Sequence, residues 1–151
     1  MDKVQLGEVI KSLDADVEIT EGKQFTEVKI PASHLYTLAK QLKENQETSF
    51  DFLFCLTGVD YGQDLGVVYH LRSTRHGHSV VLKTWTSYRE NPRLDSVADI
   101  WRTAEYHERE VYDLLGIRFI NHPDLRRFFL KSSYGFPLRK DFVDDINIVT
   151  K

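Results

Sequence analysis

The first thirty residues alternate between two hydrophobic periods. Apolar side chains recur at helical spacing close to the N-terminus and predict a short helix there, through Leu6, Val9, Ile10 and Leu13. Residues 16–20 and 25–30 then alternate apolar and polar side chains, which indicates two half-buried strands. The residues between these strands, 21–24, include a glycine and predict a turn.

A second helix and three further strands follow. Pro31 suits the first turn of a helix, and one apolar stripe continues from it through Leu35, Leu38, Ala39 and Leu42. Residues 50–60 are almost continuously apolar, which predicts a central strand buried on both faces. Residues 66–73 and 78–85 alternate with a period of two and predict a hairpin.

A third helix is predicted from Asp95 or Ser96, either of which can cap a helix N-terminus, to Gly116, a residue type that commonly ends helices. The resulting order is helix, two strands, helix, three strands, helix. It favours a two-layer α+β domain with a mixed sheet covered by helices on one face. After about residue 120 no period of 2 or 3.6 continues. We therefore expect a core domain at 1–120 and an extended C-terminal segment at 121–151.

Composition narrows the classes of protein that this chain can be. It has 151 residues and a single cysteine, so it can form neither an internal disulfide nor, alone, a cysteine-ligated iron–sulfur cluster. The sequence has no transmembrane run and no apolar segment typical of a signal peptide near its N-terminus. Residues 118–140 hold six bases and one acid, which suits an anionic partner.

Residues 105–116, EYHEREVYDLLG, carry the densest group of charged side chains. On a helix, Glu108 lies in the middle of an apolar stripe formed by Val97, Trp101, Ala104, Val111, Tyr112 and Leu115. A carboxylate there should face the core, where it needs a partner or a raised pKa. Glu105, Glu110 and Asp113 fit a solvated helix face instead.

This cluster suggests two kinds of catalytic site, a zinc site and an acid–base pair. His107 and Glu108 open like the zinc-protease pattern H-E-x-x-H, but the second histidine is replaced by Val111, which removes the paired nitrogen ligands. An acid–base pair of His107 and Glu108 is conceivable, although adjacent helical residues point about 100° apart. A buried carboxylate with a structural partner, or one that faces another protein chain, fits the pattern better.

Three linked motifs in residues 100–142 resemble the 30 kDa subunit, also called the C subunit, of NADH:quinone oxidoreductase (respiratory complex I). The first motif has Glu108, Arg109, Glu110 and Asp113, and its helix ends at Gly116; the second has His122, Pro123, Leu125 and Arg126; the third has Gly135, Pro137, Leu138, Arg139, Lys140 and Asp141. Phe128 stands where the family commonly has an aliphatic residue, and Leu115 where it commonly has phenylalanine.

The resemblance implies a structural subunit without a redox centre of its own. The whole complex would carry electrons from NADH through FMN and Fe-S clusters to quinone, coupled to ion translocation. This subunit would lie peripherally on the cytoplasmic side of the inner membrane, against the D subunit and other subunits of the peripheral arm. The family's C-terminal segment runs over the D subunit, so we expect interface residues there: Arg126, Arg127, Phe128, Phe129, Gly135, Phe136, Pro137, Leu138, Arg139, Lys140 and Asp141.

Several other functional interpretations of the sequence can be set beside the resemblance. The basic, aromatic stretch 126–140 could suit single-stranded nucleic acid, but an overall pI near 6.1 argues against it, and no nucleic-acid partner is expected. His70, His76 and His78 are expected to be solvated around the hairpin, and Cys55 to be inert in the core. No phosphate-binding or dinucleotide-binding motif occurs, so the chain is not expected to bind NADH.

Overall fold

The structure, a computed structural model, describes residues 3–22, 24–62, 64–86 and 92–125. Its helices are α1 (Lys3–Leu13), the short 3₁₀ helix η1 (Ala32–His34), α2 (Leu35–Glu44) and α3 (Ala104–Leu115). Its strands are β1 (Glu18–Glu21), β2 (Thr26–Lys29), β3 (Phe52–Asp60), β4 (Leu65–Arg72), β5 (Ser79–Thr86), β6 (Arg93–Asp95) and β7 (Arg118–Ile120).

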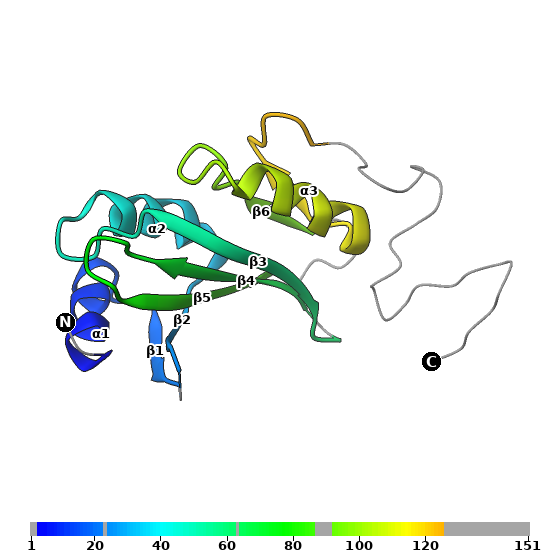
Figure 1. The fold of residues 1–151 in the computed structure, drawn as a ribbon. Coiled ribbons are helices and arrows are strands. Elements are labelled where there is room, and N and C mark those ends of the chain that lie inside the picture. The colour runs from blue at the N-terminus through cyan, green and yellow to red at the C-terminus, as the bar shows by residue number, and fades with distance from the viewer. Residues whose placement is uncertain (1–2, 23, 63, 87–91, 126–151) are drawn as a thin grey trace, which may run out of the picture.

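Five strands form one mixed sheet in the order β1-β2-β5-β4-β3. The pair β2–β5 is parallel, and the other neighbours are antiparallel. Figure 1 shows α2 and α3 along the same side of this sheet. Inward-facing side chains of the sheet join the apolar faces of α1, α2 and α3 in one core, which includes Ile10, Leu38, Tyr69 and Leu115. The predicted α+β class, the mixed sheet and the order of helices and strands as far as β5 are thus confirmed.

The predicted position of the strand at 50–60 is wrong. β3 lies at an edge of the sheet and pairs only with β4 among the described strands. The apolar residues of β3 lie on both faces of the sheet. Leu53 and Leu56 are buried on the inner face, whereas Phe52 and Phe54 are 46% and 40% exposed on the outer face. A continuous apolar run therefore does not distinguish a central strand from an edge strand with an apolar outer face.

The predicted start of the third helix is also wrong. The chain first forms β6, which pairs in parallel with β7 in a small second sheet that the periodicity does not indicate. A single turn follows, in which the Trp101 N–H donates to the Val97 carbonyl at 2.9 Å. The helix begins only at Ala104. Because the turn and the helix present the same apolar stripe, the sequence pattern is continuous although the backbone is not.

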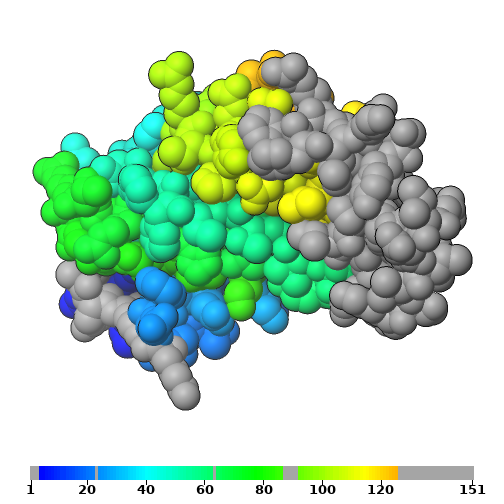
Figure 2. Space-filling model, turned by 45° about the vertical axis from the view of Figure 1, so that its right-hand side comes forward, coloured from blue at the N-terminus to red at the C-terminus, as the bar shows by residue number. Residues whose placement is uncertain are grey.

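Close packing joins α3 to β3 at a glycine. A Cβ on Gly58 would lie 2.3 Å from Leu115 Cδ1 and 2.8 Å from Val111 Cγ1, both of which belong to α3. The space-filling view shows the atoms of α3, in yellow, above those of β3 (Figure 2). Only a residue without a side chain allows this separation between helix and strand.

We expect Gly58→Ala to destabilise the protein by about 1–3 kcal/mol, since the added methyl group overpacks the contact between α3 and β3. Urea unfolding of the full chain, followed by far-UV circular dichroism, measures the loss. Thr57→Ala, at the neighbouring exposed position of β3, is the matched control and should change stability by about 0.5 kcal/mol or less. Equal losses for the two variants would contradict this account of the glycine.

Candidate functional site

Glu108 is fully buried on the inner face of α3, where its helical phase places it. Its two carboxylate oxygens have separate donors: the Ser96 hydroxyl donates to Oε1 at 2.6 Å, and the Val97 N–H donates to Oε2 at 2.9 Å. The sequence predicts Ser96 only as a possible helix cap. Its contact with Glu108, twelve positions away, leaves no trace in the spacing of apolar residues. Glu108 thus ties the turn after β6 to the middle of α3.

Burial disfavours the charged form of this carboxyl group. Desolvation raises the pKa of Glu108 from an ordinary value of 4.5 to about 7, and the hydrogen bonds from Ser96 and Val97 only partly oppose that rise. Within the described part of the chain, no lysine or arginine forms a salt bridge with Glu108. The sequence-based expectation of a core-facing carboxyl group with a raised pKa is confirmed, and its partners are a hydroxyl and an amide.

His122 lies beside Glu108 although fourteen residues separate them. Both side chains are fully buried, and His122 Nε2 is 3.9 Å from Glu108 Oε1. The Asp124 N–H donates to His122 Nδ1 at 2.9 Å, so Nδ1 carries no proton, and Nε2–H donates to the Glu105 carbonyl at 2.8 Å. A neutral imidazole therefore fastens the turn after β7 to the first turn of α3.

The remaining residues of the first motif differ in exposure. Asp113, expected to be solvated, is fully buried, so that expectation is wrong. Glu110 and Arg109 are half-buried. Gly116 ends α3 with φ of 81°, a left-handed conformation that a glycine adopts without strain.

Only part of the resemblance lies within the described residues. His122, Pro123 and Leu125 follow β7, and Leu125 packs partly buried against the core. The expected interface residues Arg126, Arg127, Phe128, Phe129, Gly135, Phe136, Pro137, Leu138, Arg139, Lys140 and Asp141 lie outside the described residues.

The histidines around the hairpin have defined partners. His70 lies in β4, between the rings of Phe25 and Phe54, and burial lowers its pKa. His76 Nε2 and His78 Nε2 lie 2.7 Å and 2.8 Å from carbonyl oxygens of residues 46 and 48, so both rings tie the hairpin turn to the loop after α2. The expected solvation holds for His76, which is exposed, but is wrong for His70 and His78, which are half-buried.

Cys55 is half-exposed in β3 and lies 3.3 Å from the Thr57 hydroxyl. The prediction from the sequence that Cys55 lies in the core is therefore wrong. Its partner across the strand pair is His70, on the outer face of the sheet.

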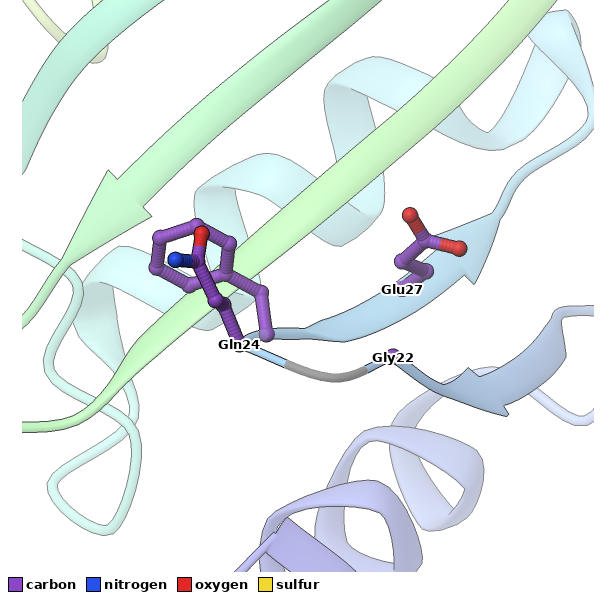
Figure 3. A pocket seen from close by; sticks show the side chains of 4 residues that line it. Gly22, Gln24 and Glu27 are labelled. Carbon is purple, nitrogen blue, oxygen red and sulfur yellow. The ribbon is translucent and has the colours of Figure 1, made fainter.

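Neither of two further polar features has the geometry of a catalytic site. Asp14, Asp16 and His34 bring potential ligand atoms within 4.8 Å of one another, but His34 Nδ1 already lies 2.8 Å from the Asp14 carboxylate. A shallow hollow beside the β1–β2 turn is lined by Gly22, Gln24, Phe25 and Glu27 (Figure 3). The single carboxylate that lines this hollow, that of Glu27, pairs with Lys83 at 3.1 Å.

Among the described residues, no helix is long and apolar enough to cross a membrane.

The contacts of Glu108 predict how α3 responds to substitution. We expect Glu108→Ala to cost about 2–4 kcal/mol of stability, because it leaves the Ser96 hydroxyl and the Val97 N–H without an acceptor and opens a cavity. Glu110→Ala removes the same side chain from a half-buried position of the same helix and should cost about 0.5 kcal/mol. Chemical unfolding of both variants at one pH measures the difference. Similar losses would show that burial of Glu108 is not what sets its contribution.

Comparison with known proteins agrees with the resemblance carried by the sequence motifs. The family model described as "Respiratory-chain NADH dehydrogenase, 30 Kd subunit" matches residues 28–145. The C/D subunit of NADH-quinone oxidoreductase from Phocaeicola vulgatus is 51% identical over 122 residues, which cover 80% of this chain and 23% of the relative. The C subunit of NADH-quinone oxidoreductase from Moorella thermoacetica is 38% identical over 136 residues, which cover 88% of this chain and 90% of the relative.

A solved structure supports the fold independently. A chain from "the membrane-bound sulfane sulfur reductase (MBS), an archaeal respiratory membrane complex" superposes with a TM-score of 0.80 at 24% identity, covering 95% of this chain and 86% of that one. The family model's match spans all three motifs, around Glu108, His122 and residues 135–141. The chain belongs to the family of the 30 kDa subunit, or C subunit, of respiratory-chain NADH dehydrogenase, that is, of complex I.

Proposed function

We propose that this chain is a structural subunit of the peripheral arm of a proton-translocating NADH:quinone oxidoreductase, and that it packs against the D subunit near the quinone site. The observation that carries the proposal is the match of the family model to residues 28–145. The whole complex passes electrons from NADH through FMN and Fe-S clusters to quinone, coupled to ion translocation. This chain helps to assemble the complex and supplies no catalytic residue.

Fused relatives support the D subunit as the partner. In several proteins named as C/D subunits, this chain matches only 22–23% of a longer polypeptide. Fusion of two sequences into one chain holds the two parts at high effective concentration, which is advantageous when they bind each other. The same argument does not identify further partners in the peripheral arm.

The C-terminal segment is the part of the chain that we assign to this interface. Its arginines can form paired hydrogen bonds with carboxylates of a partner, and its aromatic side chains can provide apolar contact area. Because His122 and Leu125 pack against the core, we place the boundary between core and interface segment after Leu125 and not at residue 120. The chain would then lie on the cytoplasmic side of the membrane, held there by other subunits.

A related respiratory assembly with another electron donor, such as a membrane-bound hydrogenase, is the second candidate. The structural similarity to a chain of a sulfane sulfur reductase complex concerns the fold alone at 24% identity. The sequence relatives at 37–51% identity carry the name NADH-quinone oxidoreductase, which favours the first proposal.

Co-expression with a tagged D subunit tests the interface. We expect the full chain to co-purify with the D subunit, and a chain ending at Leu125 to remain folded, with an unchanged unfolding transition, but to be lost from the complex. Arg139→Ala/Lys140→Ala should weaken co-purification, whereas Lys29→Ala/Lys40→Ala, which removes two exposed lysines of the core, should not. Retention of the shortened chain, or its unfolding, would contradict the assignment.

The proposed structural role also predicts the spectrum of the isolated protein. With a single cysteine and no flavin-binding motif, the chain purified without oxygen should contain neither iron nor flavin in stoichiometric amount. Metal analysis and the absorbance spectrum above 300 nm, roughly the end of the protein band, check this. A stoichiometric redox centre would refute the proposal.

A further inference from the structure

We propose that Glu108 and His122 form a pH-sensitive clasp, which holds the turn after β7 on α3 while Glu108 is protonated and loosens that turn when Glu108 loses its proton. The turn, residues 121–125, leads directly into the C-terminal segment. This inference goes beyond the proposed function, since it concerns how the start of that segment is held in the chain itself.

The clasp joins three parts of the chain at one buried point. Glu108 binds the turn after β6 through Ser96 and Val97. The Ser96 N–H in turn donates to the Ile120 carbonyl of β7 at 2.9 Å. His122, next along the chain, binds the first turn of α3 through the Glu105 carbonyl. Opening of this short two-stranded sheet would expose both buried side chains to water together.

The protonated form of Glu108 keeps a hydrogen bond on each oxygen without placing a charge in the core. A protonated Oε1 can donate to Ser96 Oγ across the same 2.6 Å, and Ser96 Oγ also accepts from the Ala98 N–H at 3.1 Å. The Val97 N–H continues to donate to Oε2. In this state Glu108 and His122 are both neutral, and burial carries no electrostatic penalty.

The ionised form leaves a buried negative charge that forms no salt bridge with a lysine or arginine among the described residues. His122 Nε2–H is directed to the Glu105 carbonyl and lies 3.9 Å from Glu108 Oε1. His122 Nδ1 accepts from the Asp124 N–H at 2.9 Å, so neither ring nitrogen of His122 is hydrogen-bonded to Glu108.

Basic groups as well as acidic ones adjoin the clasp: His107 and Arg109 flank Glu108 on α3, and Arg93 and Arg118 are exposed on β6 and β7. Tyr69 from β4, Asp95 from β6 and Asp99 from the turn before α3 are acidic groups near it. Glu105 and Tyr112 precede and follow Glu108 on α3, and Asp124 follows His122. The Tyr69 hydroxyl is buried without a hydrogen-bond partner among the described residues, so this region already holds an unsatisfied polar group. The inner face of β3 presents apolar Leu53 and Leu56.

The direction of the pH effect follows from linkage. The pKa of Glu108 is higher in the folded state, about 7, than its ordinary 4.5, because burial opposes ionisation. The contribution of this group to stability is therefore fully present below pH 4.5 and is lost as the pH rises through about 7. Opening of the clasp restores water to the carboxylate, so the open form becomes more populated in that pH range.

Hydrogen exchange of the full chain alone tests the clasp, and failure of the D subunit to bind would not affect the result. After correction for intrinsic exchange rates, protection of peptides covering 93–101 and 117–125 should fall about tenfold between about pH 6 and about pH 8. Peptides from α2 should show no such fall. Protection that does not depend on pH at the clasp would overturn the proposal.

Three variants assign the effect to Glu108. Glu108→Gln resembles the protonated carboxyl group and should abolish the pH dependence, whereas Glu110→Gln should leave it unchanged. Ser96→Ala removes a hydrogen bond that lowers the pKa of Glu108, so the fall in protection should move to higher pH. A wild-type pH dependence in Glu108→Gln, or an unmoved midpoint in Ser96→Ala, would each contradict the clasp, and either variant tests it if the other fails to fold.

Discussion

A buried carboxyl group at the centre of an apolar helix face constrains the C-terminal half of the described chain. Glu108 can remain there only because the turn after β6 supplies a hydroxyl and an amide to its two oxygens. That requirement holds residues 96 and 97 against α3, and Ser96 in turn holds β7. The position of β7 then brings His122 under the first turn of the same helix.

The close contact between α3 and β3 makes this arrangement possible. Gly58 lets the helix approach an edge strand, so that α3 covers the inner face of β3 at its carboxyl end. Earlier in β3, the Thr103 hydroxyl donates to the Leu53 carbonyl at 3.0 Å and locates the helix start along the strand. The sheet, the helix and the turns around Glu108 therefore form one body, from which the chain continues beyond Leu125.

Such a body suits a subunit whose proposed contribution is to hold others in place. The described core has an outer sheet face with exposed aromatic side chains, at Phe52, Phe54 and Trp85. Surfaces of that kind are common where proteins meet other proteins, and they agree with membership of a family named for a multisubunit enzyme.

Local sequence patterns alone determined much of the secondary structure of this protein and the direction of its side chains. The helices at 3–13 and 35–44, the hairpin of β4 and β5, the left-handed glycine at the end of α3 and the inward direction of Glu108 all follow from spacing within one element, because a helix or strand fixes which side chains share a face. The motifs from Glu108 to Asp141 also sufficed to indicate the family, since their order is specific.

Tertiary contacts decided the remainder. β3 is an edge strand because its neighbours in the sheet come from elsewhere in the chain, and its own apolar run does not record which of them are present. The pairing of β6 with β7 depends on residues 93–95 meeting residues 118–120 across the whole length of α3. Burial of His122 beside Glu108 depends on the same return of the chain. Periodicity reports which face of an element is apolar, whereas the partner that covers that face is set by the packing of the complete fold.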